Sequence, residues 1–181
     1  MIMINTYMKS FLKNLRENAG FTLIELLVVI GILGVLAAAL IATIDPFEQI
    51  KKANDTNSKN TTVEFINANI RYYTTHGKLP WEAGQVTGCA STANSLNAAS
   101  AQNCVTGLIA EGELKSAFNN ASSVLETIRY TGSTSNVIAC YQPDSKAGQK
   151  DPNTIYNGTT GLATTGCKSQ GGSTDCYWCS Q

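Results

Sequence analysis

The chain has 181 residues, a formal net charge of zero and six cysteines, and 43% of its residues are hydrophobic. This length fits one modest globular domain together with an additional segment. The balanced charge shows no overall basic surplus, so the composition does not support DNA as a partner, although a local basic patch would not appear in this total.

The apolar residues are concentrated in one stretch near the N-terminus. Every residue from 26 to 42 is apolar or Gly. With the apolar residues on either side, about 20 residues can cross the hydrocarbon core of a bilayer at ~1.5 Å each. The stretch is therefore interpreted as a membrane span.

The charges on the two sides of this span predict its orientation. Lys9, Lys13 and Arg16 precede it with only Glu17 as a nearby acid, whereas the charges that follow are mixed. Basic residues favour the cytoplasmic side, which places residues 1–20 there and everything from Asp45 onward outside. Six cysteines in a small outer domain then indicate disulfides.

A distinctive sequence joins the basic segment to the apolar run: Gly20-Phe21-Thr22-Leu23-Ile24-Glu25-Leu26. It closely resembles the type IV prepilin signal. In that family a membrane-embedded aspartic peptidase cuts between the residues matching Gly20 and Phe21, methylates the new amine of the Phe, and leaves the hydrophobic helix in place. Gly suits a cleavage site because it lets the protease approach the backbone closely.

Glu25 is the only carboxylate within the apolar run, where a charge costs at least ~2.5–3.5 kcal/mol. One interpretation places it in headgroup water, one turn into the helix, with a small gain from the helix dipole. The other needs a cation. Cleavage supplies one at Phe21, about 6 Å away along its own helix. Pairing within one helix is strained, so we expect Glu25 to bind the Phe21 amine of a staggered neighbour. The resemblance implies the same role.

Small residues in the span suggest where helices can approach one another. Gly34, Ala38 and Ala42 form a stripe at four-residue spacing, and Gly31 adds a second point of close approach. Gly and Ala are also common in any membrane span, so single positions carry little weight. Many pilins carry a Pro inside this helix, and here no Pro occurs before Pro46.

The span is predicted to continue into a second helix. Asp45 is a candidate N-cap and Pro46 suits the first helical position, while Gly77 and Pro80 are stop signals. We therefore expect a helical spine from about residue 22 to 76. An apolar stripe in its second half would pack on a sheet: Val63, Ile66, Ile70 and Tyr73.

The remaining elements are less distinct. Residues 108–118 predict a short helix, and 124–130 with 137–141 predict an antiparallel hairpin. Residues 154–156 and 175–178 are weaker strand candidates, and the polar stretches 84–104 and 143–174 are predicted as long surface loops. The expected fold class is α+β and pilin-like: a long N-terminal helical spine, half transmembrane and half amphipathic, packed on a small antiparallel sheet with disulfide-pinned loops.

Six cysteines allow fifteen complete pairings, and the sequence does not choose among them. Ranked by locality, the candidates are Cys89–Cys104, Cys167–Cys176 across a Gly171-Gly172 turn, and Cys140–Cys179; the last resembles the disulfide-closed C-terminal region of many pilins. Cys176 and Cys179 also form a Cys-x-x-Cys motif, for which a redox centre or half of a zinc site are the alternatives.

Few other residues suggest a site. His76 stands at the expected helix end, where capping of the last carbonyls is its simplest role. Asp144 and Asp151, in a Gly-containing loop, give only a faint hint of calcium binding. The sequence shows no catalytic triad, phosphate loop or carboxylate pair. We therefore expect no enzyme activity, no cofactor and no metal.

These features predict a structural subunit of a type IV pilus or related filament. Residues 1–20 form a cleaved leader, 21–44 a transmembrane and assembly helix, and 45–181 an extracytoplasmic head. The resemblance implies identical and minor pilins, a prepilin peptidase, and an assembly platform with its ATPase as partners, first in the membrane and then in a surface filament. The alternatives are a pseudopilin of a type II secretion or DNA-uptake apparatus, and a membrane-anchored binding module that does not polymerise.

Overall fold

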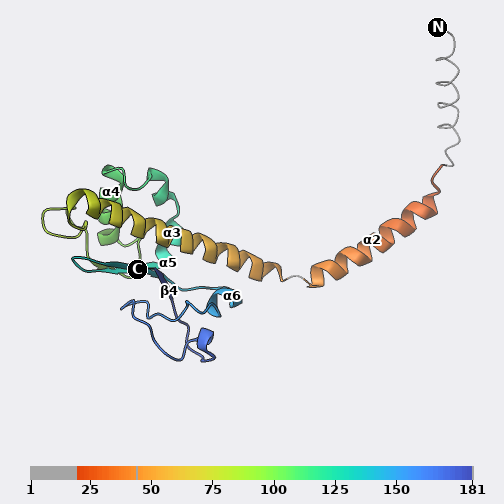
Figure 1. Cartoon of the computed structure of the whole chain (residues 1–181). Helices are drawn as coiled ribbons and strands as arrows, with labels where there is room; N and C mark the ends of the chain where they lie inside the picture. The colour runs from red at the N-terminus through yellow and green to blue at the C-terminus, as the bar shows by residue number, and fades with distance from the viewer. Residues whose placement is uncertain (1–19, 44, 181) are drawn as a thin grey trace, which may run out of the picture. The chain divides into compact units, whose positions relative to one another are not determined.

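The structure is a computed structural model that describes residues 20–43 and 45–180. The chain divides into two compact units between Asp45 and Pro46, and each is described here by itself (Figure 1). Residues 1–19 of the expected leader lie outside the described residues.

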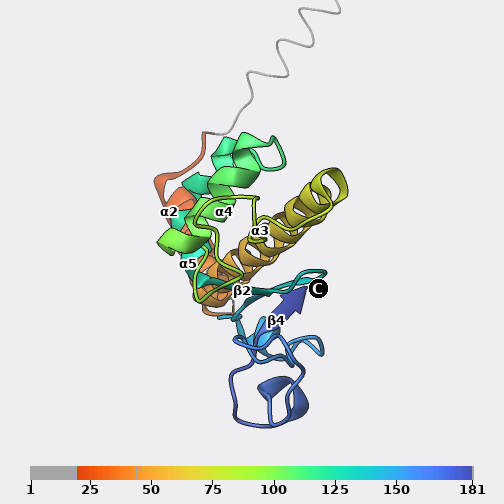
Figure 2. The same cartoon turned by 90° about the vertical axis from the view of Figure 1, so that its left-hand side faces the viewer.

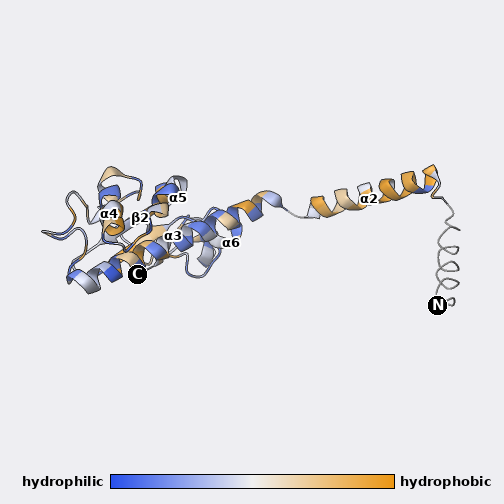
Figure 3. Cartoon of the chain, turned by 90° about the horizontal axis from the view of Figure 1, so that it is seen from above, coloured by the Kyte–Doolittle hydropathy of each residue, from blue (hydrophilic) through white to orange (hydrophobic). Residues whose placement is uncertain are grey.

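The described part of the first unit contains one long helix, α2 (Leu23–Thr43), of 21 residues. Its Leu, Ile, Val and Ala residues favour or tolerate helix, and the helix passes through Gly31 and Gly34 without interruption. The segment Leu23–Ile41 is long and apolar enough to cross a membrane. Figure 3 shows this apolar character along α2.

The second unit begins with α3 (Pro46–His76), a helix of 31 residues. Its predicted limits are confirmed: Pro46 is the first helical residue, and Gly77 follows the last with a φ of 69°. The expected spine consists of two helices, α2 and α3, with the predicted restart at Pro46. The proline ring disfavours a helical conformation at the preceding residue, and Asp45 is non-helical.

A four-stranded antiparallel sheet follows, in the order β1-β2-β3-β4. Its strands are β1 (Thr92–Ala93), β2 (Ile128–Gly132), β3 (Val137–Tyr141) and β4 (Trp178–Ser180). The central hairpin pairs Tyr130 with Ala139, and β4 pairs Cys179 with Cys140. The two outer strands contain only two and three residues.

Short helices complete the head: α4 (Ala99–Ala110), the 3₁₀ helix η1 (Ser116–Asn120), α5 (Ser122–Thr127), α6 (Lys146–Gln149) and the 3₁₀ helix η2 (Lys168–Gln170). In Figures 1 and 2 the sheet separates α4 from the irregular segment that follows β3. The α+β class with disulfide-pinned loops is therefore confirmed.

The core lies between α3, the sheet and the two helices α4 and α5. Phe65 of α3 is fully buried, and its ring lies 5.2 Å from that of Tyr130 on β2. Leu108, Leu125 and Ile128 fill the same cluster. Burying side chains of this size contributes about 1.5–3 kcal/mol each.

The predicted helix over 108–118 is wrong. Helix α4 lies earlier, at Ala99–Ala110, and so occupies the end of the expected 84–104 loop. Gly112 stops further helix because it adopts a φ of 78°, which favours glycine. Phe118 is still buried, but from the separate helix η1.

The predicted strand 124–130 is half wrong. Residues up to Thr127 form α5, and only the part from Ile128 is strand. Leu125 and Ile128 are both fully buried, a three-residue spacing that a helical turn satisfies and strand alternation does not. The last strand lies at 178–180 instead of 175–178, and around 155 only Tyr156 forms isolated bridges.

Candidate functional site

The region around Gly20 and Phe21 is open. Gly20, Phe21 and Thr22 are non-helical and exposed, directly before α2 begins at Leu23. A Cβ atom added to Gly20 would meet no other atom of the described residues within 4 Å. The described residues therefore leave room for a side chain at this position.

Thr22 and Glu25 form a reciprocal cap at the start of α2. The backbone N–H and the hydroxyl of Thr22 both donate to Oε2 of Glu25, at 2.9 and 2.8 Å. The N–H of Glu25 in turn approaches Oγ1 of Thr22 at 3.3 Å. This is a capping box, which satisfies two backbone donors that the first helical turn leaves free.

The capping box leaves half of the carboxylate available. Within the described part of the chain, Oε1 of Glu25 has no hydrogen-bond partner, because all the bonds of this group fall on Oε2. Sequence reasoning identified Glu25 but missed Thr22. The signal was present as the spacing Thr-x-x-Glu before an apolar run.

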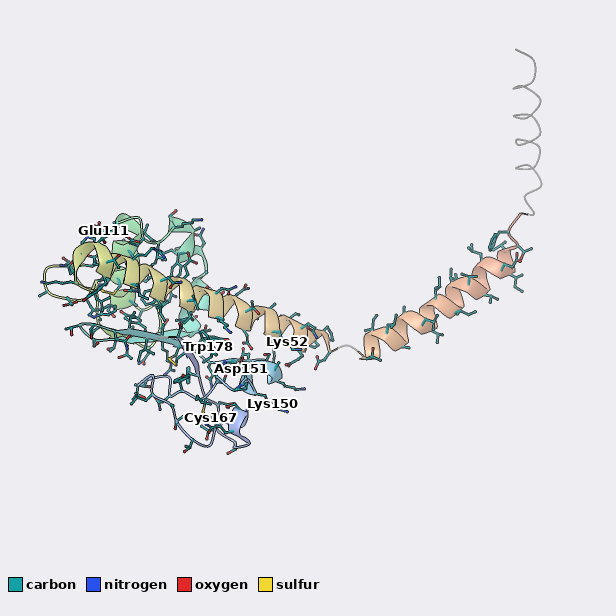
Figure 4. The ribbon with its side chains drawn as sticks, in the orientation of Figure 1. Lys52, Glu111, Lys150, Asp151, Cys167 and Trp178 are labelled. Atoms are coloured by element: carbon teal, nitrogen blue, oxygen red, sulfur yellow. A yellow bond between two sulfur atoms is a disulfide. The ribbon has the colours of Figure 1, made fainter. Side chains whose placement is uncertain are left out.

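Within the described part of the first unit, the surface of α2 is exposed. The side chains of its Leu, Ile and Val residues are exposed around the whole helix (Figure 4). Gly34 and Ala38 lie one turn apart on this surface, and a Cβ added to Gly34 would meet nothing within 4 Å. The side chain of Ala42, the third member of the predicted stripe, lies outside the described residues.

All six cysteines are paired, and the three bonds are those ranked first by locality: Cys89–Cys104, Cys167–Cys176 and Cys140–Cys179. Cys176 and Cys179 thus belong to different disulfides. The Cys-x-x-Cys motif forms neither a disulfide of its own nor a dithiol, so the redox and zinc alternatives have no support in this arrangement.

His76 lies at the end of α3, as expected of a capping residue. Its Nδ1 lies 3.1 Å from the carbonyl oxygen of Tyr72, and the two rings stack with centroids 4.0 Å apart. On the other side, Nε2 lies 3.6 Å from a carboxylate oxygen of Glu111. The residue therefore joins the end of α3 to the end of α4.

The faint calcium hint receives no support from the geometry. Asp144 donates its N–H to Asp55 instead of offering a ligand, and Asp151 accepts the N–H of Asn153. No three His, Cys, Asp or Glu side chains within residues 20–43 and 45–180 are placed to share a metal ion.

A shallow hollow beside α6 is lined by both acidic and basic side chains, including Lys52 and Asp151 (Figure 4). Its charges are largely engaged. Asp55 binds the loop that precedes α6, and Nζ of Lys59 lies 4.7 Å from the ring centroid of Trp178. We assign no ligand to it.

The comparisons with known proteins agree with the geometry of the first unit. The prokaryotic N-terminal methylation motif matches residues 15–41. No curated protein and no solved structure matches the chain significantly. The match covers Gly20, Phe21, Glu25 and most of α2.

The motif is the class III signal of type IV pilins and pseudopilins. Together with the apolar helix, it fits a protein that is anchored in the membrane and assembled into a surface filament. At its N-terminus the chain therefore carries the signal that prepilin peptidase processes in type IV pilins and pseudopilins.

Proposed function

We propose that the chain is a structural, non-enzymatic subunit of a type IV pilus or a related filament. Prepilin peptidase removes the leader between Gly20 and Phe21 and methylates the new amine. Residues 21–44 then polymerise in the filament core, and residues 45–181 form the head that faces outward.

The observation that carries this proposal is the position of Glu25 at the start of an apolar helix whose side chains are exposed within the described part of the first unit. Lipid tails solvate the Leu, Ile and Val side chains of α2 as well as a neighbouring helix does, so apolar burial does not favour the filament over the membrane. The carboxylate is different. It costs at least ~2.5–3.5 kcal/mol in lipid, and a cation supplied by a neighbour removes this cost.

The capping box makes the pairing geometrically simple. Because Thr22 uses only Oε2 of Glu25, the helix stays capped while Oε1 accepts the Phe21 amine of a neighbouring subunit. The pair fixes the axial stagger between two helices, and small residues at Gly34 and Ala38 then allow close packing.

The proposed partners follow from this assembly. Identical subunits and minor pilins share the filament, the peptidase acts on Gly20, and an inner-membrane assembly platform with its ATPase moves the subunit out of the bilayer. Pili and pseudopili of secretion or DNA-uptake systems use the same signal, so the proposal includes both.

The test compares Glu25→Ala with Gly20→Val in cells that make the filament. We expect Glu25→Ala to insert and be cleaved but to yield few filaments, whereas Gly20→Val leaves uncut precursor. The matched control is Glu64→Ala, which removes an exposed carboxylate from α3. Sheared filaments are counted by electron microscopy, and the peptide is identified by mass spectrometry.

Two outcomes contradict the proposal. Normal filaments from Glu25→Ala refute the pairing of Glu25 with a neighbour. A wild-type chain that is cleaved but recovered only as a membrane-bound monomer instead supports an anchored binding module.

A further inference from the structure

The large apolar side chains that the head exposes are few and unevenly placed. Within residues 45–180 they are Phe47, Ile50, Ile70, Tyr73 and Leu162. Four of the five belong to α3, as one pair near each end of the helix. The two pairs differ in shape, because one projects and the other borders a hollow.

The pair near the start of α3 continues the stripe that faces the core. Phe47 precedes Phe65 by 18 residues, and Ile50 precedes Ala68 by the same number. Eighteen residues make about five full helical turns, so Phe47 points in the same direction around the helix as Phe65, and Ile50 in the same direction as Ala68. Phe65 and Ala68 are fully buried, whereas Phe47 is 75% exposed and Ile50 58% exposed. The stripe therefore continues along α3 beyond the core, where its side chains are exposed.

The pair near the end of α3 borders a hollow of about 230 Å³. The hollow is lined by four apolar or aromatic residues and two polar ones: Ile70, Tyr73, Leu79, Val137, Ser135 and Asn136. A cavity of roughly 150 Å³ is enough to hold benzene. The hollow therefore has room for one phenyl ring.

The two features cannot meet within one molecule. Phe47 and Ile70 lie on one continuous helix, about 35 Å apart at ~1.5 Å per residue. A contact between them must join two copies. An apolar projection that fits a hollow elsewhere on the same protein forms a head-to-tail contact, which repeats without closing.

We infer that Phe47 of one subunit inserts into the hollow beside Ile70 and Tyr73 of another copy of this chain. The inference rests on the proposed filament and adds a second axial contact to it, between heads instead of membrane helices. A ring that is in reach of lipid before assembly, four residues beyond the end of α2, is then covered again when the subunit leaves the bilayer.

Cysteine crosslinking in filaments of the full chain tests this contact. All native cysteines are in disulfides, so Phe47→Cys with Ile70→Cys adds the two free thiols. Oxidation is expected to give a ladder of dimers, trimers and higher multimers on a non-reducing gel, since each copy can link to two others. Phe47→Cys alone gives at most dimers. The matched control is Phe47→Cys with Leu162→Cys, which pairs the ring position with an exposed apolar residue outside the hollow.

Intact filaments in which the 47–70 pair crosslinks no better than the 47–162 pair overturn the inference but leave the proposed function standing. Absence of wild-type filaments defeats the proposed function itself. Should the cysteine variants not assemble, Phe47→Leu and Phe47→Asp replace them. We expect the first to form filaments and the second to form few, with unchanged thermal unfolding of the head, and normal filaments from Phe47→Asp also overturn the inference.

Discussion

The carboxylate of Asp55 on α3 accepts both the N–H and the hydroxyl of Ser145, at 3.0 and 2.6 Å, across a sequence separation of 90 residues. The N–H of Asp144 donates to the other oxygen of Asp55 at 2.8 Å. One buried acid thus holds the loop that leads into α6. Nearby, Glu48 accepts the N–H of Lys146 at 2.6 Å, so α3 binds this loop at two points.

Removing this carboxylate should destabilise the head. Asp55→Ala leaves three donors without their acceptor, and we expect a loss of about 2–4 kcal/mol in the free energy of unfolding. Asp55→Asn keeps one acceptor oxygen and should lose less. Urea unfolding of the detergent-solubilised chain, followed by the fluorescence of Trp81 and Trp178, measures both. Glu64→Ala is the control and should change stability by less than about 0.5 kcal/mol; an equal effect of both alanine variants contradicts the role of Asp55.

The capping box predicts a role for Thr22 in assembly. Thr22→Val keeps the shape but loses the hydroxyl, which weakens the helix start by about 1 kcal/mol and frees Glu25 to rotate. We expect normal cleavage with fewer filaments. Thr22→Ser restores the hydroxyl and should assemble like the wild type. The ratio of filament to cleaved subunit, measured by immunoblot after shearing, decides this, and equal ratios for Val and Ser leave Thr22 without a role.

The three disulfides should contribute unequally to stability. Their sequence separations are 39, 15 and 9 residues for Cys140–Cys179, Cys89–Cys104 and Cys167–Cys176. Under the loop-entropy description, the longest exceeds the shortest by about 1.3 kcal/mol. Replacing each pair with serines should therefore lower the thermal midpoint most for Cys140–Cys179. The reverse order excludes loop entropy as the main source of the stabilisation.

Alkaline pH should weaken the head through its buried tyrosines. Burial raises the pKa of Tyr130 to about 12, and burial with the nearby carboxylates of Asp55 and Asp151 also raises the pKa of Tyr141. The unfolded state releases these protons near pH 10, so stability is full below that pH and falls as pH rises toward about 12. Tyr130→Phe should flatten the fall in thermal midpoint above about pH 10, whereas Tyr73→Phe, at an exposed position, should not. Identical pH profiles for the two variants contradict this role of Tyr130.

Local signals predicted the helical framework and the signal sequence, and long-range contacts explain most of the errors. Pro46 and Gly77 set the limits of α3 through their own backbone preferences. By contrast, the hydrogen bonds of Asp55 could not be predicted. The stretch 54–60 is wholly polar, and nothing near Asp55 in the sequence shows that its donors lie around Ser145. Helix α4 is a different case. Its buried residues have a helical spacing that was available but overlooked in a segment rich in Ser, Asn and Ala: Ala101, Cys104, Val105 and Leu108.

The short outer strands of the sheet bear on how crowded heads avoid aggregation. Strand β1 contains two residues and β4 three, so each edge of the sheet has few unpaired N–H and C=O groups with which another chain could form strand pairing. Long, regular edges are templates for amyloid-like pairing, and brief ones are a common protection against it. Subunits held side by side at very high local concentration can thus remain separate folded bodies.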